Sequence, residues 1–361
     1  MKNERIVVVK VGTKVLTTGN TLDKEKVRAI VDQICAAQEK AFRVILVTSG
    51  AIGAGMGLLE LKKRPQSLEA LQAAASIGQG ELMHVYGGYF REKGYLVGQI
   101  LLTQEDFNDR KRYLNIKDTL KTLMTYRAVP IINENDTVST EEIKFGDNDS
   151  LARLVADLMQ AQHLILLTDV DGFLDEEGRV IPVVAEITPK IARLARSSRG
   201  DLGTGGMATK LEAARKAVAS GIACTIANGN VKDVIVRIMS GERVGTTFST
   251  GKARMDAKKR WIAYSVTPQG SITVDEGAED VLKNRSKSLL ASGIVGAEGD
   301  FEAGATVRIV SRDGREIGRG ICRYPRRSID RIKGHTTAEI AKILGPDAKG
   351  EVIHKDNLVI L

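Results

Sequence analysis

Two lysines stand beside glycines at places where apolar runs give way to turns. Lys10 stands near the end of the apolar run 5–11, two residues before Gly12. Burying an unpaired ammonium is costly, so this lysine needs an anionic partner or an exit to water. Taken alone, the pattern favours a lysine that snorkels from a strand end. Lys210 follows the glycine-rich stretch 203–206, where a cation near a helix N-terminus costs about 0.3–1 kcal/mol. A bound anion would offset that cost, and phosphate is the obvious candidate; a flexible loop with a solvated lysine is the alternative.

Two further turns follow apolar runs. The stretch 48–55 (TSGAIGAG) consists mainly of small residues, whose exposed backbone N–H groups suit an anion. A tight turn with close helix–sheet packing is the alternative. The stretch lacks the G-x-x-x-x-G-K-[ST] pattern, which argues against ordinary P-loop chemistry. The stretch 166–172 (LLTDVDG) places Thr168 and Asp169 at a strand end. They could contact a nucleotide or its metal, although a simple Asp-Gly turn explains the pattern equally well.

Acidic and amide side chains gather in two neighbouring segments, 133–136 (NEND) and 146–150 (GDNDS). Asp and Asn favour turns and helix N-caps, so we expect one cap here. Two such clusters around one loop exceed what capping requires. Carboxylates and amides together suit a small zwitterion, because they can meet both its ammonium and its carboxylate.

A regular framework must bring these turns together. The first 240 residues alternate short apolar runs with longer amphipathic stretches. The runs are rich in β-branched residues, which is typical of strands buried on both faces. They cover 5–11, 43–48, 95–102, 128–132, 163–167 and 222–226. Apolar residues at helical spacing predict a helix over 206–220. The pattern predicts an α/β fold with an open, mostly parallel sheet sandwiched by helices, whose ligands gather beyond the carboxyl ends of the strands.

Composition suits an ordinary globular protein of two domains. The chain has 361 residues, of which 43% are hydrophobic and 27% are charged. No apolar run approaches the roughly 18 residues of a membrane span, and the N-terminus lacks a signal-peptide pattern. The three widely spaced cysteines indicate neither a disulfide framework nor a zinc site. We therefore expect a cytoplasmic protein.

The character of the sequence changes after about residue 250. Strand-like pieces appear at 271–274, 305–310, 316–321 and 358–361, with a helix predicted near 279–290. We predict a catalytic domain over 1–250, a basic linker over 251–266 and a small β-rich domain over 267–361. Much of the formal charge of +8 lies in the linker around Lys258. A solvated linker is the favoured interpretation, and a patch attracted to polyanions is the alternative.

Taken in order, the turns of the first domain resemble the amino-acid kinase family. The matching stretches are VVKVGT (8–13), TSGAIGAG (48–55), NENDTV (133–138), FGDNDSLA (145–152), LLTDVDG (166–172) and GTGGMATK (203–210). The KVGT and GDND motifs resemble the members that act on the side-chain carboxylate of glutamate rather than on acetylglutamate, carbamate, aspartate or UMP. The resemblance implies an ATP-dependent phosphotransferase that forms L-glutamyl 5-phosphate, the first step of proline synthesis. Another carboxylate or phosphate kinase of the same fold is the alternative.

The resemblance also assigns roles by motif position. Lys10 and Lys210 would flank the transferring phosphoryl group, and Asp149 would hold both lysines. Glutamate would be bound by Ser49, Gly50, Asp136 and Asn148. ATP would be bound by Lys10, Gly12, Thr168, Asp169, Thr204, Gly205, Gly206, Met207, Ala208, Thr209 and Lys210. Family membership further implies Mg²⁺ as a cofactor, feedback inhibition by proline, a homo-oligomer (dimer or tetramer) formed through the kinase domain, and functional coupling to glutamyl-phosphate reductase.

The chemistry implied by the resemblance needs no catalytic histidine. None of the four histidines lies in a polar turn of the first domain, so Ser/His/Asp or Cys/His nucleophilic catalysis is not indicated. A glutamate carboxylate, with a pKa of about 4.3, is already ionised at neutral pH. The obstacle is repulsion between an anionic nucleophile and a triphosphate, which two lysines and Mg²⁺ can offset.

The stretch 269–334 resembles a PUA domain, a small β-barrel-like module often found in RNA-modifying enzymes. RNA binding through this domain is therefore an alternative function. It calls for base-stacking aromatic side chains in a basic groove, whereas aromatic residues make up only 4% of the chain. Tyr324, beside Arg323 and Arg326, is the one candidate for stacking in the tail.

Overall fold

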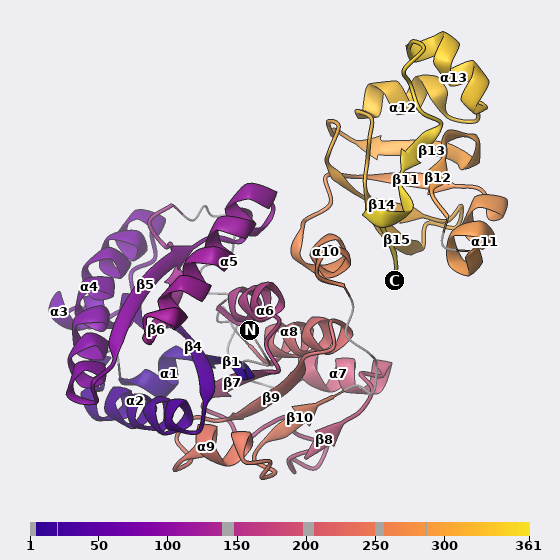
Figure 1. Ribbon diagram of the computed structural model, residues 1–361. Helices are drawn as coiled ribbons and strands as arrows, with labels where there is room; N and C mark the ends of the chain where they lie inside the picture. Colours follow the sequence, from indigo (N-terminus) through magenta and orange to yellow (C-terminus); the bar gives the residue numbers. More distant parts are fainter. Residues whose placement is uncertain (1–4, 20, 139–147, 198–205, 250–255, 286) are drawn as a thin grey trace. The chain divides into compact units, whose positions relative to one another are not determined.

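The computed structural model describes residues 5–19, 21–138, 148–197, 206–249, 256–285 and 287–361. The chain divides into two compact units, residues 1–254 and residues 255–361 (Figure 1). The first unit contains the turns that the sequence singled out for catalysis, and the second contains the β-rich tail.

An eight-stranded sheet forms the centre of the first unit, in the order β5-β6-β4-β1-β7-β9-β10-β8. Its described strand pairs are parallel, apart from β10 against β9. The strands are β1 (Arg5–Val11), β4 (Phe42–Thr48), β5 (Leu96–Leu102), β6 (Ala128–Glu134), β7 (His163–Thr168), β8 (Val183–Val184), β9 (Ala223–Asn228) and β10 (Thr246–Phe248), beside a small pair formed by β2 (Thr17–Thr18) and β3 (Thr21–Leu22). All six apolar runs form strands of this sheet, so the predicted α/β fold is confirmed.

Helices cover both faces of the sheet (Figure 1). The helices α2, α4 and α9 pack on one face, and α5, α6 and α8 pack on the other. The helices of the unit are α1 (Thr13–Leu16), α2 (Lys24–Glu39), α3 (Ala51–Leu58), α4 (Leu68–Glu92), the 3₁₀ turn η1 (Gln104–Phe107), α5 (Arg110–Thr125), α6 (Asn148–Met159), α7 (Pro189–Ser197), α8 (Met207–Ala219) and α9 (Val234–Met239). The predicted helix over 206–220 is therefore confirmed as α8.

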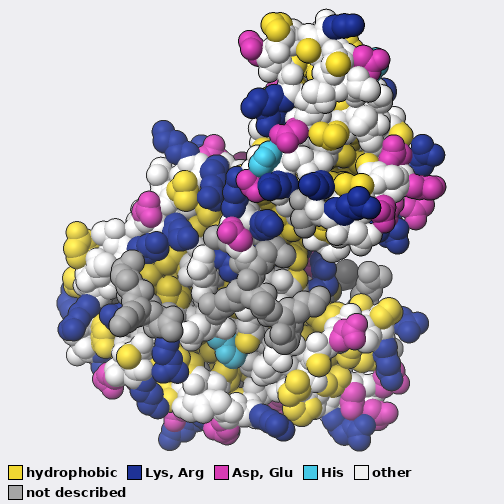
Figure 2. Space-filling model, turned by 45° about the vertical axis from the view of Figure 1, so that its right-hand side comes forward, with side chains coloured by type: hydrophobic (Ala, Val, Ile, Leu, Met, Phe, Trp, Pro, Cys, Tyr) yellow, Lys and Arg dark blue, Asp and Glu magenta, His cyan; other side chains and the backbone are white. Residues whose placement is uncertain are grey.

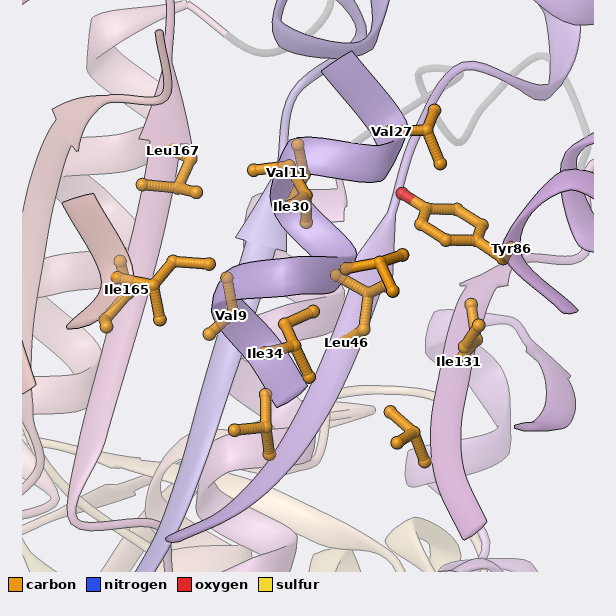
Figure 3. Close-up of a cluster of buried hydrophobic side chains, with 14 of the residues drawn as sticks. Val9, Val11, Val27, Ile30, Ile34, Leu46, Tyr86, Ile131, Ile165 and Leu167 are labelled. Atoms are coloured by element: carbon orange, nitrogen blue, oxygen red, sulfur yellow. The ribbon is translucent and has the colours of Figure 1, made fainter. Parts of the chain in front are cut away.

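Alternate strand residues fill the core between the sheet and α2 (Figure 3). Val9 and Leu46 point toward Ile30 and Ile34 of α2, and all four side chains are buried. Each such side chain contributes about 1.5–3 kcal/mol of burial free energy. The intervening strand residues, such as Val8, are buried as well. Strands buried on both faces explain why the runs are continuously apolar.

The central strand β1 sets the position of the first lysine. It pairs with β4 on one side and β7 on the other, and Lys10 stands in register with Val47 and Leu166. Because these strands are parallel, their carboxyl ends meet at one edge of the sheet. The turns after β1, β4, β6 and β7 therefore open at the edge where α/β folds bind ligands.

Two glycines let α3 and α4 touch through their backbones. A Cβ built on Gly78 of α4 would lie 1.8 Å from the carbonyl oxygen of Ala51, at the first residue of α3. A Cβ on Gly55 would lie equally close, 1.8 Å, to the carbonyl oxygen of Ala74. This contact fixes the start of α3, which is the turn predicted to bind substrate.

We expect Gly78→Ala to destabilise the protein, because its methyl group must displace backbone at a cost of about 1–3 kcal/mol or more. Gly80 provides a matched control on the same helix, since a Cβ there meets nothing within 4 Å. Gly80→Ala should leave stability unchanged or raise it by up to about 1 kcal/mol. Urea unfolding of both variants measures the difference, and equal midpoints would contradict the close packing.

The second unit is built on a five-stranded sheet in the order β13-β11-β14-β15-β17, beside a two-stranded pair, β12-β16. Its strands are β11 (Gly270–Val274), β12 (Leu289–Leu290), β13 (Ile294–Gly299), β14 (Thr306–Val310), β15 (Glu316–Ile321), β16 (Glu351–Ile353) and β17 (Leu358–Ile360). Its helices are α10 (Ala257–Arg260), the π turn η2 (Trp261–Ser265), α11 (Glu276–Arg285), η3 (Ala291–Gly293), α12 (Arg326–Ile332), α13 (Thr337–Leu344) and η4 (Lys355–Asn357). A separate apolar core includes Ile272, Val307 and Ile329.

Two segments of this unit differ from the sequence expectation. The predicted helix near 279–290 starts earlier, at Glu276, and ends at Arg285, after which Leu289 and Leu290 pair as a strand with β16. The predicted linker is helical over 257–265, and its Trp261 is buried rather than solvated. A large aromatic side chain is more stable buried than in water, which explains why this part of the linker is ordered.

Candidate functional site

Two lysines and one aspartate meet beyond the carboxyl end of β1. The Nζ atom of Lys10 lies 2.7 Å from Oδ1 of Asp149, and the Nζ atom of Lys210 lies 3.1 Å from Oδ2 of the same carboxylate. Lys10 comes from β1, Asp149 from the first turn of α6 and Lys210 from the first turn of α8. Asp149 is fully buried, and each lysine is about 5% exposed or less. The anionic partner that both lysines required is therefore one shared carboxylate.

The lysine–aspartate cluster carries a net positive charge, because two ammonium groups face one carboxylate. Burial alone would raise the pKa of Asp149, but Lys10 and Lys210 outweigh burial and hold that pKa below its ordinary value. Burial and the nearby Lys10 charge lower the pKa of Lys210, although Asp149 opposes both effects. The Oγ1 atom of Thr209 donates to the same Asp149 oxygen at 3.2 Å. A buried excess of positive charge favours the binding of a further anion.

A second cluster joins the turns after β4 and β6 to the first residue of α6. The Nδ2 group of Asn148 lies within hydrogen-bonding distance of three acceptors, which its two N–H groups share: Oγ of Ser49 at 2.9 Å, the carbonyl oxygen of Thr48 at 3.1 Å and Oδ1 of Asn133 at 3.1 Å. Ser49 Oγ accepts here, so its own O–H remains able to donate. Gly50 follows with a φ of 98° and caps α3 without a side-chain bond. A left-handed φ favours glycine, and the uncapped N–H groups of α3 suit an anion.

The carboxyl group of Asp136, just after β6, has a pKa far above its ordinary value. Asp136 follows Glu134 by two residues, and the pKa of Asp136 is raised to about 7 by burial and by the negative charge of Glu134. The Arg64 guanidinium opposes this rise. A carboxylate held in such a place gains from a cationic ligand, because a positive charge would favour its ionised form.

The turns after β1 and β7 lie side by side. The N–H of Gly12 donates to the carbonyl oxygen of Leu167 at 3.0 Å, and a Cβ on Gly12 would lie 3.2 Å from that oxygen. Thr168 donates to Asp169 at 3.2 Å, and Asp169 pairs with Lys14 at 3.2 Å.

The first turn of α8 is the fifth of the predicted turns. Gly206 begins the helix without a side-chain cap, so N–H groups at Met207 and Ala208 stay available to an anion. Thr204 and Gly205, two of the predicted ATP-binding residues, lie outside the described residues.

The sequence places this chain in a known family. The model of the amino acid kinase family matches residues 5–228, and the PUA domain model matches residues 270–344. Glutamate 5-kinase of Caldanaerobacter subterraneus subsp. tengcongensis is 48% identical over 98% of this chain and 97% of that protein. Glutamate 5-kinase of Moorella thermoacetica is 46% identical over 100% of this chain and 97% of that protein. The chain belongs to the glutamate 5-kinases of the amino acid kinase family.

Similarity to the glutamate 5-kinases extends over both units. Glutamate 5-kinase of Geobacter sulfurreducens, for example, is 46% identical over 98% of this chain and 97% of that protein. Among solved structures, carbamate kinase from Giardia lamblia bound to AMP-PNP has a TM-score of 0.49 and 16% identity over 69% of this chain and 100% of that chain. None of the described helices is both long and apolar enough to cross a membrane.

Two polar residues contact this site although no motif assigned them a role. Asn133 belongs to the NENDTV motif but had no assigned role, and it contacts Asn148 directly. Gln79 lies within α4, far from every motif, and accepts a hydrogen bond from Asn133 at 2.8 Å. Nothing in the sequence around position 79 marks this residue, so only the fold reveals its contact.

Proposed function

We propose that the chain transfers the γ-phosphoryl group of ATP to the side-chain carboxylate of L-glutamate, giving ADP and L-glutamyl 5-phosphate, the first step of proline synthesis. The observation that supports this reaction most strongly is the buried cluster of Lys10, Asp149 and Lys210. Its net positive charge offsets the repulsion between an anionic acceptor and a triphosphate. Asp149 fixes the two ammonium groups before substrates bind, so little reorganisation is needed in the transition state.

Glutamate and ATP would occupy different parts of the site. Ser49, Gly50, Asp136 and Asn148 bind glutamate: Asp136 suits the ammonium, while the free Ser49 O–H and the uncapped start of α3 suit a carboxylate. ATP occupies the turns at Gly12, Thr168, Asp169 and 204–210, with its terminal phosphate between Lys10 and Lys210. The acceptor oxygen is already ionised, so no side chain needs to act as a base.

Magnesium is part of the proposal as a component of the ATP complex. Across the described residues, no group of three or more His, Cys, Asp or Glu side chains could hold a metal ion. Phosphate oxygens with at most one or two carboxylates are the usual ligands of Mg²⁺ in kinases. We propose Asp169 as the contributing carboxylate, because its pair with Lys14 lies at the surface, whereas Asp149 is buried between two lysines. When bound, Mg²⁺ neutralises phosphate charge.

An acceptor panel tests the proposed reaction. With ATP, Mg²⁺ and hydroxylamine, we expect glutamate to give hydroxamate, because the acyl phosphate product is labile and hydroxylamine traps it. Acetylglutamate and aspartate should give hydroxamate at no more than about one hundredth of the glutamate rate, since the site must reject altered or shorter acceptors. UMP, which forms no acyl phosphate, is followed by ADP release instead. Product with another acceptor and none with glutamate would reject the proposal.

Glutamate binding should depend on pH through Asp136. Its pKa is raised to about 7, and only the ionised form attracts the substrate ammonium. Lowering the pH from 8 to 6 reduces the ionised fraction about tenfold, so the KM for glutamate should rise up to about tenfold at saturating ATP. Asp136→Asn should raise that KM above pH 7, leave it near the wild-type value well below pH 7, and so remove its pH dependence. A flat KM in the wild-type enzyme would contradict the role of Asp136.

The second unit offers little support for RNA binding as the main function. Three arginines around its one stacking candidate are paired with acids: Arg319 with Glu316 at 2.6 Å, Arg326 with Asp330 at 3.1 Å and Arg323 with Glu351 at 3.6 Å. Tyr324 uses its hydroxyl to donate to the carbonyl oxygen of Lys349. Lys and Arg side chains are interspersed with Asp and Glu on the visible face (Figure 2). A filter-binding salt series measures any residual RNA affinity.

The proposal includes partners implied by family membership. A homo-oligomer is supported by the edge strand β5, where Leu96 is 63% exposed and Leu101 is 37% exposed, since unpaired apolar edges favour association. Proline is proposed as a feedback inhibitor, and glutamyl-phosphate reductase as the consumer of the labile product. A cytoplasmic location agrees with Cys35, Cys224 and Cys322, which are buried free thiols.

A further inference from the structure

Three side-chain amides form a continuous chain from α4 to the start of α6. Asn133 Nδ2 donates to Gln79 Oε1 at 2.8 Å, and Asn148 Nδ2 donates to Asn133 Oδ1 at 3.1 Å. Gln79 lies in α4, Asn133 near the end of β6 and Asn148 at the first residue of α6. The chain therefore links a helix that carries no motif to a residue proposed to bind glutamate.

Backbone groups fix which end of each amide is nitrogen. The backbone N–H of Glu134 donates to Asn133 at 2.9 Å, so the accepting atom must be the Asn133 oxygen. The carbonyl oxygen of Thr48 faces Asn148 at 3.1 Å, so the atom that approaches it must be the Asn148 nitrogen. The Asn133 nitrogen therefore faces Gln79. The Gln79 atom that accepts this hydrogen bond must be its oxygen. The orientation of all three amides follows from these contacts.

This arrangement leaves the side-chain oxygen of Asn148 without a donor among the described residues. The Asn148 nitrogen already faces three acceptors, on Thr48, Ser49 and Asn133. The Asn148 oxygen is buried and has no hydrogen-bond partner within the described part of the chain, and the residue is 3% exposed. A buried acceptor without a donor is costly, so a ligand that brings N–H groups would be favoured here.

We propose that Gln79 is a positioning residue that selects for the α-ammonium of the acceptor amino acid. By holding Asn133, it keeps the Asn148 nitrogen turned toward the protein and the Asn148 oxygen available to the substrate ammonium. Asp136 supplies the charge at that end of the substrate, and Asn148 supplies a directed acceptor. The inference rests on the proposed glutamate kinase function and adds a residue that, through Asn133, helps to hold the direction of Asn148.

Removing the acceptor at position 79 would bring hydrogen-bond donors against one another around Asn133. Without an acceptor at position 79, the Asn133 nitrogen is left buried and unpaired, which favours rotation of its amide. Rotation would turn N–H groups toward the backbone N–H of Glu134 and toward the Asn148 nitrogen. Asn148 would then lose one of the three acceptors that hold its nitrogen, while those on Thr48 and Ser49 remain. The effect reaches the substrate through two hydrogen bonds and leaves the lysine–aspartate cluster unchanged.

Two substitutions separate this role from a merely structural one. Gln79→Met keeps the length of the side chain but removes the acceptor, whereas Gln79→Glu keeps an acceptor oxygen. The assay measures kcat, the KM for ATP, the KM for glutamate and the competitive Ki of glutarate, which is glutamate without its amine. For Gln79→Met we expect the glutamate KM to rise about 5–10-fold, with kcat, the ATP KM and the glutarate Ki within about twofold.

Each result of this assay either supports the role of Gln79 or overturns it. Gln79→Glu should keep the glutamate KM within about threefold of the wild-type value. The inference is overturned if Gln79→Met leaves the glutamate KM unchanged, if it weakens glutarate as much as glutamate, or if Gln79→Glu behaves like Gln79→Met. If glutarate does not inhibit the wild-type enzyme, the test uses only the glutamate KM of Gln79→Met and its comparison with Gln79→Glu. A wild-type enzyme that makes no hydroxamate from glutamate instead overturns the proposed function itself.

Discussion

Lys210→Met should lower kcat by about 10²–10³ while the glutamate KM changes no more than a few-fold. Lys210 lies against Asp149, opposite Lys10, and the cluster carries one excess positive charge. Replacing Lys210 removes that excess at the place where negative charge develops during phosphoryl transfer. The expected size is that of losing one preorganised transition-state donor. Lys10→Met should behave in the same way, because both ammonium groups contact the same carboxylate.

Lys216→Met is a matched control on the same helix. Lys216 is more exposed and pairs with Glu212 at the surface of α8, so kcat should stay within about twofold. Thermal unfolding of each variant shows whether the fold is intact; the 2.7 Å contact between Asp149 and Lys10 does not involve Lys210. A rise in the glutamate KM with kcat unchanged would contradict the proposal, because it would make Lys210 a substrate-binding residue only.

Much of the fold was predictable because its signals are local. Each apolar run, such as 5–11, carries its own strand preference and glycine or polar boundary, and the structure places all six runs in the sheet. The segment 279–290 shows the limit: Leu289 and Leu290 continue an apolar pattern, but pairing with β16 makes them a strand. Pairing between segments distant in the chain leaves no trace in a local pattern, so such boundaries shift.

The same reasoning explains which site residues were found. Lys10, Asp149 and Lys210 lie in motifs, so a family resemblance locates them, although their shared carboxylate is visible only in three dimensions. Gln79 has no motif, and its contact with Asn133 spans 54 residues. The raised pKa of Asp136 likewise depends on burial and on Glu134, which residue types alone do not reveal. Chemistry that depends on environment requires the fold.

Asp149→Asn should cost about 3–5 kcal/mol of stability at pH 7, because it leaves two buried ammonium groups without their counter-charge. The pKa of Lys210 is already lowered by burial and by Lys10, and Asp149 is what opposes that shift. In the variant the pKa of this lysine falls further below its unfolded value. The unfolded state then binds more protons than the folded state from the lowered pKa up to about pH 10, so stability rises with pH over that interval.

The deficit of Asp149→Asn should therefore shrink as the pH is raised from 7 to 9.5, which guanidinium unfolding at each pH measures. Asp157→Asn is the control on the same helix, since Asp157 is equally buried and pairs with Arg153 at 2.8 Å. An arginine cannot lose its proton in this range, so the deficit of Asp157→Asn should stay constant. Equal pH dependence in the two variants would contradict the role of Asp149 in holding the charge of Lys210. A deficit that shrinks only for Asp149→Asn would show that this carboxylate holds the charge of Lys210.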